Sequence, residues 1–499
     1  MSAEAPNLHI LFFPGLFPGH MLPMTQMAKA FAARGVRVTI LTTPANSPAI
    51  QPAIAGTHIG LRTIPFPSAA SGLPEGCENL YSLPPSLHFQ FITAIPLLRG
   101  PFDEALREIR PDCIVSDSFM PWTFASAREL GIPRIAFCGT CFFSTCVFDH
   151  MVQQWPLQSL PPGTQSFFLP EIPHRIEMLV SQIPEFHLAG TPSSELFRLM
   201  SDVDGESYGM LTNSFYELET EYVEHYRKVI GRRSWHVGPL SLLRESPAAT
   251  SPSGGRDPCL KWLDRKPPCS VVYICFGSIS SFTKAQLQEI ALGLEAAGHL
   301  FLWVVNLVGT DGSGELLPEG FEERVKDRGL VIRRWAPQIE ILSHRSVGGF
   351  LTHCGWNSSV EAICAGIPVA TWPLFAEQFY NERLLVEVLK IAVSVGLKKC
   401  TPNSEERTLV DASTVEVAVR KLMEEGEEAA GRRRRVGELR EKAQRAVEEG
   451  GSSYEDLGRV IGELVEMKQA MGIEGKTMKA VNGEEKEAER IEENRKYEG

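Results

Sequence analysis

Short, unbroken apolar runs alternate along the chain with segments of helical hydrophobic spacing. The run "LHILFFP" (8–14) predicts a strand buried on both faces, because its side chains stay apolar without alternation. "MTQMAKAFAARG" (24–35) then has helical spacing and ends in a glycine, and "VRVTILTT" (36–43) is again typical of a strand. Strand, helix and strand in close succession form a βαβ unit, which requires a parallel sheet.

The same alternation recurs through the chain and is interrupted once. "DCIVSD" (112–117) opens another strand–helix–strand unit. "SVVYICFGS" (270–278), "KAQLQEIALGLEAAG" (284–298) and "LFLWVV" (300–305) form a further unit. Between them, "RESPAATSPSGGRDP" (244–258) is rich in serine, proline and glycine, which favours a linker. The pattern therefore predicts two doubly wound, Rossmann-like α/β domains that face one cleft.

Domain limits follow from these changes of pattern. The end of the chain is dense in charge and poor in aromatic residues, which favours a solvated or disordered tail. The predicted units are a first domain (1–243), a linker (244–258), a second domain (259–453), a helix returning to the first domain (454–470) and the charged tail (471–499).

Composition narrows the classes of function. The hydrophobic fraction of 43% and the charged fraction of 22% are typical of a globular protein, and the net charge of -12 disfavours nucleic acid and anionic membranes as partners. The eleven scattered cysteines favour reduced thiols over a disulfide framework. The first apolar run ends at Pro14 and Gly15, and no run is long enough to span a bilayer. These features predict a cytoplasmic protein.

Two residues of the first domain stand at predicted strand ends. Ligands of open parallel sheets bind outside the carboxyl ends of the strands, where His20 and Asp117 are expected. A histidine whose second ring nitrogen bonds a carboxylate has a fixed tautomer and can take a proton from a hydroxyl. The alternatives are an ordinary surface histidine and a carboxylate that caps the next helix.

The second domain contains a candidate anion site. "THCGWNSSVEAICAG" (352–366) leaves a strand and enters a helix through small and polar residues, so free N–H groups and the helix dipole favour an anion there. Neither a G-x-G-x-x-G nor a Walker motif is present. Ordinary helix capping is the alternative. The side chains expected at this site are His353, Asn357 and Ser358, with added hydroxyls from Ser278 and Ser280.

Four further residues of this domain suggest recognition of a nucleotide and a sugar. Trp335, in the loop "RRWAPQ", can stack on a base if it is exposed rather than part of the core. Glu361 shares a helix face with the anion site and can accept bonds from ribose hydroxyls. Glu377 and Gln378 combine a carboxylate with an amide, which suits vicinal sugar hydroxyls, although both also suit a polar helix start.

Aromatic residues that follow strand ends in the first domain are candidates for an apolar acceptor pocket, with core packing as the alternative. They are Phe119, Trp122, Phe142 and Phe143. Thr140 lies beside them and is expected to approach the sugar. No metal site is predicted, because the D-x-D of "SDVDGE" (201–206) lacks the remaining ligands of a calcium loop.

Residues 335–378, "WAPQIEILSHRSVGGFLTHCGWNSSVEAICAGIPVATWPLFAEQ", resemble the signature box of plant secondary-metabolite UDP-sugar glycosyltransferases, the family 1 enzymes. The likeness extends to "GHMLPM", "GLPEGCENL", "SFYELE" and "WHVGPLS", which resemble the branch acting on flavonoids, triterpenoids and steroids. The resemblance implies the two-domain GT-B fold, with the acceptor on the first domain and the UDP-sugar on the second.

The resemblance also implies roles for individual residues. His20 would be the catalytic base and Asp117 its partner. Gln378 resembles the glucose-preferring form, and Glu377 stands where aspartate is common in the family. The implied contacts are Trp335 and Ala336 with uracil, Gln338 and Glu361 with the ribose, Ser278, His353, Asn357 and Ser358 with the diphosphate, and Trp356, Glu377 and Gln378 with the sugar.

The expected function is inverting transfer of glucose from UDP-glucose to a hydroxyl of a small lipophilic plant metabolite, by a monomer that uses neither a metal nor a cofactor. C-glucosylation of an activated phenol ring and use of another UDP-sugar stay open. A Rossmann dehydrogenase is disfavoured by the missing glycine fingerprint. A catalytically dead nucleotide-sugar binder is disfavoured by the presence of both His20 and Asp117.

Overall fold

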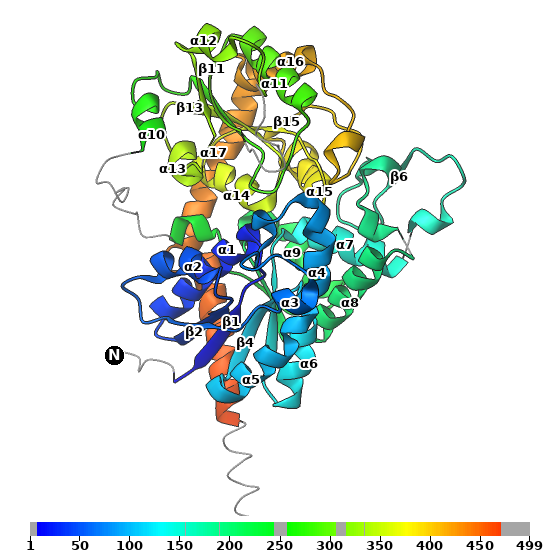
Figure 1. Ribbon diagram of the computed structural model, residues 1–499, viewed down its shortest axis with the longest axis vertical. Coiled ribbons are helices and arrows are strands. Elements are labelled where there is room, and N and C mark those ends of the chain that lie inside the picture. The colour runs from blue at the N-terminus through cyan, green and yellow to red at the C-terminus, as the bar shows by residue number, and fades with distance from the viewer. Residues whose placement is uncertain are drawn as a thin grey trace, which may run out of the picture.

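The computed structural model describes residues 7–154, 156–188, 190–243, 257–305, 316–333 and 335–470. The predicted linker (244–258) lies outside the described residues except for its last two positions. The whole predicted tail (471–499) also lies outside them. Figure 1 shows the first domain in blue to green, below the second domain in green to orange.

The first domain is built on a seven-stranded sheet in the order β3-β2-β1-β4-β5-β8-β9, in which every pairing is parallel. A separate antiparallel hairpin stands at its margin (Figure 1). The strands of the sheet are β1 (His9–Phe13), β2 (Arg37–Thr42), β3 (Gly60–Thr63), β4 (Cys113–Asp117), β5 (Arg134–Cys138), β8 (Gly209–Thr212) and β9 (Ser234–His236), and the hairpin is β6 (Ser166–Phe168) with β7 (Glu177–Leu179). The helices are α1 (Pro18–Ala33), α2 (Ser47–Ile54), α3 (Ser68–Ser71), α4 (His88–Ala94), α5 (Arg99–Ile109), α6 (Trp122–Glu129), α7 (Phe142–Gln154), α8 (Pro192–Glu206) and α9 (Thr220–Lys228).

The second domain has a six-stranded parallel sheet in the order β12-β11-β10-β13-β14-β15. The strands are β10 (Val271–Cys275), β11 (Leu300–Val304), β12 (Gly329–Ile332), β13 (Val347–Thr352), β14 (Val369–Thr371) and β15 (Ala392–Ser394). The helices are α10 (Pro258–Leu263), α11 (Lys284–Ala297), α12 (Phe321–Val325), α13 (Gln338–Leu342), α14 (Trp356–Ala365), α15 (Gln378–Arg383), the π-helix η9 (Leu384–Val388), α16 (Ala412–Met423) and α17 (Glu427–Val447). The short 3-10 turns of both domains are η1 (Leu80–Ser82), η2 (Pro85–Leu87), η3 (Ile95–Leu98), η4 (Pro156–Ser159), η5 (Val180–Gln182), η6 (Glu185–His187), η7 (Tyr216–Leu218), η8 (Leu240–Leu243) and η10 (Ser404–Glu406).

The central strand β1 explains why its sequence is apolar throughout. Successive side chains of a strand point to opposite faces, and both faces of this sheet are covered. Ile10 and Phe12 pack with α1 on one face. Leu11 and Phe13 pack with α5 on the other face. Two parallel sheets, each covered by helices, confirm the predicted pair of doubly wound α/β domains.

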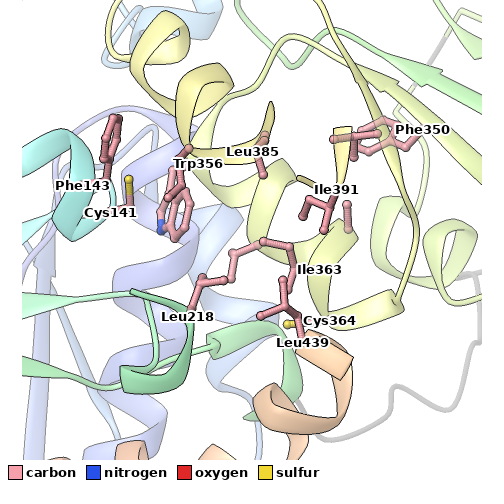
Figure 2. Packing of buried hydrophobic residues seen from close by; sticks show 14 of the residues in the cluster. Cys141, Phe143, Leu218, Phe350, Trp356, Ile363, Cys364, Leu385, Ile391 and Leu439 are labelled. Carbon is pink, nitrogen blue, oxygen red and sulfur yellow. The ribbon is translucent and has the colours of Figure 1, made fainter. Parts of the chain in front are cut away.

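One apolar cluster continues from the first domain into the second. Cys141, Phe143 and Leu218 of the first domain and Trp356 and Ile363 of the second belong to the same group of buried side chains (Figure 2). Each buried side chain of this size is worth about 1.5–3 kcal/mol relative to exposure. The two domains are therefore joined by a continuous core.

The C-terminal segment crosses from the second domain to the first. After α17, which packs against α14, residues 452–470 form a helix on the first domain. Leu457 and Val460 join the core under β1 and α1. In Figure 1 the orange to red helices descend along both domains. None of the helices in the described part of the chain combines the length and apolar character that crossing a membrane requires.

A buried carboxylate fixes this C-terminal helix. Asp456 is 0% exposed, and its carboxylate lies 2.8 Å from Nδ1 of His236 and 3.1 Å from the Arg227 guanidinium. The backbone N–H of His236 also donates to Asp456, at 3.1 Å. Removing one partner of a buried charged cluster leaves the other charges without compensation.

We predict that Asp456→Ala lowers the free energy of unfolding by about 3 kcal/mol. Chemical denaturation of the full chain measures this value. Glu455→Ala is the matched control, because Glu455 is the adjacent carboxylate on the same helix and is exposed. Equal stability of the two variants would contradict the role assigned to Asp456.

Candidate active site

The carboxyl ends of the two sheets meet at the interface between the domains. The side-chain amide of Asn357, at the start of α14, donates to the carbonyl of Gly19 in the first turn of α1, at 2.6 Å. The Trp356 indole N–H donates to the carbonyl of Asn213, just after β8, at 2.7 Å. Residues that follow β1 and β8 of the first sheet thus contact the helix that follows β13 of the second.

His20 and Asp117 form a hydrogen-bonded pair at this interface. His20 lies in the first turn of α1, and its Nδ1 is 2.7 Å from Oδ2 of Asp117, at the end of β4. Asp117 is 0% exposed and its other oxygen accepts the backbone N–H of Phe119 at 2.9 Å. Because Nδ1 donates to the carboxylate, the lone pair of the neutral imidazole lies on Nε2. The predicted pairing of the two side chains is present.

Two glycines make room for this pair. A Cβ on Gly15 would lie 2.8 Å from Oδ2 of Asp117, and one on Gly139 would lie 2.8 Å from Cε1 of His20. Any larger residue at either position would therefore displace the pair. The sequence draws attention to Gly15, which precedes His20, whereas Gly139 follows β5 and no local pattern marks it.

The surroundings of His20 favour its protonated form. Burial disfavours the imidazolium, but the charge and hydrogen bond of Asp117, followed by the charge of Glu377, outweigh burial and raise the pKa of His20 above its usual value. The neutral ring that can accept a proton at Nε2 therefore becomes the main form only as the pH rises through this raised pKa.

Gly139 also stands between two cysteines, Cys138 and Cys141, with the C-x-x-C spacing of dithiol motifs. Burial raises the pKa of the Cys138 thiol to about 12 and holds that of Cys141 well above its usual value. Nucleophilic and redox cysteines need a thiolate, which these surroundings disfavour. The two thiols therefore act as small packing groups beside the His20 pair.

The candidate anion site lies at the start of α14. The His353 ring fits between two glycines, because a Cβ on Gly277 or Gly355 would lie within 2.6 Å of its Nε2. Burial lowers the pKa of His353 to about 4, so the ring stays neutral. Ser278 is exposed beside it, whereas Ser280 is 1% exposed. The structure thus places Ser278 toward the surface and corrects the expectation for Ser280, whose hydroxyl is buried.

A hydrogen-bond network links α13 to α14 next to this anion site. Gln338 donates to Oγ of Ser358 at 2.9 Å and to Oε2 of Glu361 at 2.8 Å. Ala336 is buried, while the Trp335 side chain is 76% exposed. Trp335 is therefore not a core residue, and an exposed indole of this kind can stack on a planar ligand.

Glu377 lies close to the His20 pair. Burial raises the pKa of Glu377, although its own backbone N–H, the charge of His20, the Asn381 amide and the backbone N–H of Trp356 act in the opposite direction. Asn381 is 0% exposed and donates to Oε1 of Glu377 at 3.3 Å, and it accepts the Ser144 hydroxyl at 2.8 Å. Asn381 thus joins the Glu377 carboxylate to α7 of the first domain. No sequence pattern marks Asn381 as a site residue, although it lies one helical turn beyond Glu377.

Two expectations for the sugar side need correction. The Trp356 indole is 2% exposed and donates to Asn213, so this side chain belongs to the core between the domains (Figure 2), and only its backbone N–H faces Glu377. The amide oxygen of Gln378 accepts the backbone N–H groups of Leu374 at 2.9 Å and Phe375 at 3.2 Å. Gln378 can therefore offer a sugar its amide N–H groups, but not its oxygen.

Comparison with known proteins agrees with this geometry. Residues 259–409 match the family model described as UDP-glucoronosyl and UDP-glucosyl transferase. The chain is 44% identical over 472 residues to scopoletin glucosyltransferase of Nicotiana tabacum, covering 92% of this chain and 98% of that one. It is also 44% identical to UDP-glucose flavonoid 3-O-glucosyltransferase 7 of Fragaria ananassa, covering 93% and 97%. The chain belongs to the UDP-glycosyltransferase family.

The fold of this UDP-glycosyltransferase agrees with its sequence relationships. The crystal structure of Glycyrrhiza uralensis UGT73P12, complexed with glycyrrhetinic acid 3-O-monoglucuronide, matches with a TM-score of 0.89 at 39% identity, over 96% of this chain and 99% of that one. The two sheets therefore form the predicted GT-B fold, and the resemblance of residues 335–378 to the family's signature box is confirmed at the level of the family.

The predicted acceptor residues of the UDP-glycosyltransferase are only partly brought together. Phe119 lies 5.5 Å from the His20 ring. Phe142 and Phe143 are 0% exposed and pack on Tyr226 and Tyr222, so they are core residues of α7. Trp122 packs on Phe13 and Phe102 instead. Thr140 follows Gly139 and keeps a buried hydroxyl that has no hydrogen-bond partner in the described part of the chain.

Other aromatic side chains extend from Phe119 instead. Phe197 of α8 lies 5.5 Å from Phe119, stacks on Phe186 of η6 at 4.0 Å, and lies 5.7 Å from Phe148 of α7. All four rings are half-buried. We call Phe119, Phe148, Phe186 and Phe197 the aromatic row. The last three come from separate elements and follow no common spacing, which is why the sequence did not indicate them.

We predict that Asp117→Asn lowers the pKa of His20, because the negative charge that opposes the effect of burial is removed. NMR titration of the histidine ring protons measures this pKa, with the His20 signal assigned by its loss in His20→Ala. Asp112→Asn is the matched control, since this carboxylate precedes the same strand but accepts the backbone N–H of His9 instead. An unchanged His20 titration in Asp117→Asn would contradict the coupling.

Proposed function

We propose that the protein transfers glucose from UDP-glucose to a hydroxyl group of a small lipophilic acceptor, with inversion at the anomeric carbon. The observation that carries this proposal is the position of the His20–Asp117 pair. The hydrogen bond of 2.7 Å occupies Nδ1 of His20 and leaves Nε2 as the basic nitrogen. The charge of Glu377, from the second domain, acts on the same ring. A base on one domain thus stands next to the candidate sugar-binding side of the other.

His20 is the proposed general base. Its Nε2 takes the proton of the acceptor hydroxyl while the hydroxyl oxygen forms a bond to the anomeric carbon. The bond from that carbon to the diphosphate breaks on the opposite side, and UDP leaves with the electron pair, which inverts the configuration. Asp117 stabilises the imidazolium that forms and fixes its orientation. General-base assistance of this kind typically contributes about 10² to 10⁴ in rate.

The start of α14 is proposed to stabilise the departing UDP. The free N–H groups and the dipole of this helix favour negative charge, and the neutral His353 ring adds a donor without a competing positive charge. Ser278, Asn357 and Ser358 are the proposed neighbours of the diphosphate. Trp335 would stack on uracil, beside Ala336, and Gln338 would orient Glu361 toward the ribose. In this scheme the protein itself supplies the charge stabilisation, without a metal ion or another cofactor.

The names of the relatives support the choice of substrates. Scopoletin, flavonoids and anthocyanins appear in the names of relatives, and the donor UDP-glucose appears in one of them. Glu377, Gln378 and Thr140 are the proposed contacts of the glucose unit. For the acceptor we propose a phenolic or triterpenoid scaffold held beside Phe119. Activity as a monomer in the cytoplasm also stays a prediction.

We predict hexose transfer when the full chain is incubated with UDP-glucose, EDTA and a mixed plant phenolic extract, read as a mass increase of one hexose. His20→Ala should lower turnover at least about a hundredfold, the lower end of the usual contribution of a general base. Resistance of the product to acid would indicate a C-glucoside rather than an O-glucoside. Activity that EDTA abolishes and magnesium restores would contradict the metal-free scheme, and full activity of His20→Ala would contradict the role of His20.

We further predict that Gln378→His raises the ratio of kcat/KM for UDP-galactose to that for UDP-glucose by about tenfold, the usual effect of one hydrogen bond. The matched control is Gln286→His, because Gln286 is also buried but exchanges its hydrogen bonds with the backbone of Val410. That control should change stability and leave the donor ratio as it is. An unchanged ratio in Gln378→His would rule out sugar recognition by Gln378.

A further inference from the structure

The far end of the aromatic row carries a buried histidine that the proposed chemistry does not use. The His187 ring lies 4.7 Å from Phe186 and 5.3 Å from Phe148, and the residue is 1% exposed. Neither of its ring nitrogens has a hydrogen-bond partner within the ranges that the structure describes. An imidazole fully removed from water, with both nitrogens unsatisfied, is unusual in a protein core.

A second unsatisfied polar group lies beside it. The Tyr380 ring is 5.9 Å from the His187 ring, Tyr380 is 1% exposed, and its hydroxyl also has no partner in the described part of the chain. Tyr380 belongs to α15, three residues after Glu377, and His187 belongs to η6 of the first domain. The two groups thus meet where the aromatic row ends against the second domain.

Packing alone does not explain these two polar groups. A buried donor or acceptor without a partner destabilises the fold, whereas an apolar ring of similar shape would not. Burial lowers the pKa of His187 to about 3, so the ring stays neutral and offers one N–H donor and one nitrogen acceptor. The Tyr380 hydroxyl likewise both donates and accepts. A neutral ligand oxygen is the group that satisfies such a pair.

We propose that His187 and Tyr380 recognise a second oxygen substituent, a hydroxyl or a carbonyl, on a flat phenolic acceptor whose reacting hydroxyl lies at His20. The placement of the acceptor between His20 and the His187–Tyr380 pair rests on the proposed function. The aromatic row supplies planar, half-buried surfaces between the two ends. Because His187 is 1% exposed, side chains packed on it, such as Phe186 and Phe148, must move for an acceptor to reach its nitrogens.

The chemistry of His187 and Tyr380 determines which ligand group they can recognise. Carboxylates are disfavoured as partners, because His187 and Tyr380 are both neutral and offer no positive charge to balance a negative one. A phenolic hydroxyl satisfies both groups at once, since it donates one hydrogen bond and accepts others. His187 and Tyr380 therefore select acceptors by their substitution pattern, at a point remote from the oxygen that receives glucose.

The test compares binding of 3-hydroxyflavone and 7-hydroxyflavone with that of their 4′-hydroxylated derivatives, by isothermal titration calorimetry in the presence of UDP. We expect the full-length wild type to bind at least one 4′-hydroxylated compound about tenfold more tightly than its parent. His187→Phe should bind both members of that pair equally, and its Tm should equal or exceed that of the wild type. A wild type without preference, or a variant that keeps it, overturns the inference.

Further variants separate recognition from packing. Tyr380→Phe removes only a hydroxyl and should weaken the same preference, while His187→Asn keeps a donor and an acceptor and should retain part of it. The matched control is His9→Phe, because His9 is also buried but its Nε2 is satisfied by Thr39 at 2.9 Å. This control should lower the Tm and leave the preference unchanged.

Glucose transfer to the same four flavones is measured in parallel. Transfer without a preference for the 4′-hydroxyl would overturn the inference and leave the proposed function intact. A binding preference that depends on His187, in a protein that transfers no glucose, would contradict the proposed function and support the recognition of the distal oxygen.

Discussion

The arrangement of the site depends on a direct contact between the ends of two parallel sheets. The hydrogen bond from the Trp356 indole to the carbonyl of Asn213, at 2.7 Å, is buried and connects the first turn of α14 to the residue after β8. A buried hydrogen bond is costly to leave unmade, so this contact fixes the separation and the orientation of the two domains. His20 and Glu377 can influence each other only because that separation is small.

The sequence predicts features that follow from chain topology. Strands such as β1 are recognisable because both faces of a parallel sheet are buried, so every side chain is apolar. The His20–Asp117 pair is predictable for a related reason: β1 and β4 are neighbours in the sheet, and residues at their carboxyl ends must lie together. Trp335 could be placed only through the family resemblance, since an exposed indole and a core indole give the same local pattern.

The direction in which a side chain points was less accessible to prediction. Phe142 and Phe143 follow β5, as a binding residue would, but the first turn of α7 directs them into the core. Trp356 follows β13 in the same way and packs between the domains. The position of a residue along the chain shows at which end of the sheet it lies. Whether its side chain contacts a ligand or packs in the core depends on the helix that faces it. Phe186 and Phe197 come together only through such packing between separate elements.

The helix formed by residues 452–470 has a consequence for the synthesis of the chain. Leu457 and Val460 join the cluster that Phe12 of β1 and Phe31 of α1 form on one face of the first sheet, so that part of this apolar face stays uncovered until the end of translation. At a usual rate of about 5–20 residues per second, the roughly 220 residues between the first domain and Val460 take about 11–43 seconds to be made. During that interval the nascent first domain presents an uncovered hydrophobic surface, the kind of surface that chaperones bind in general.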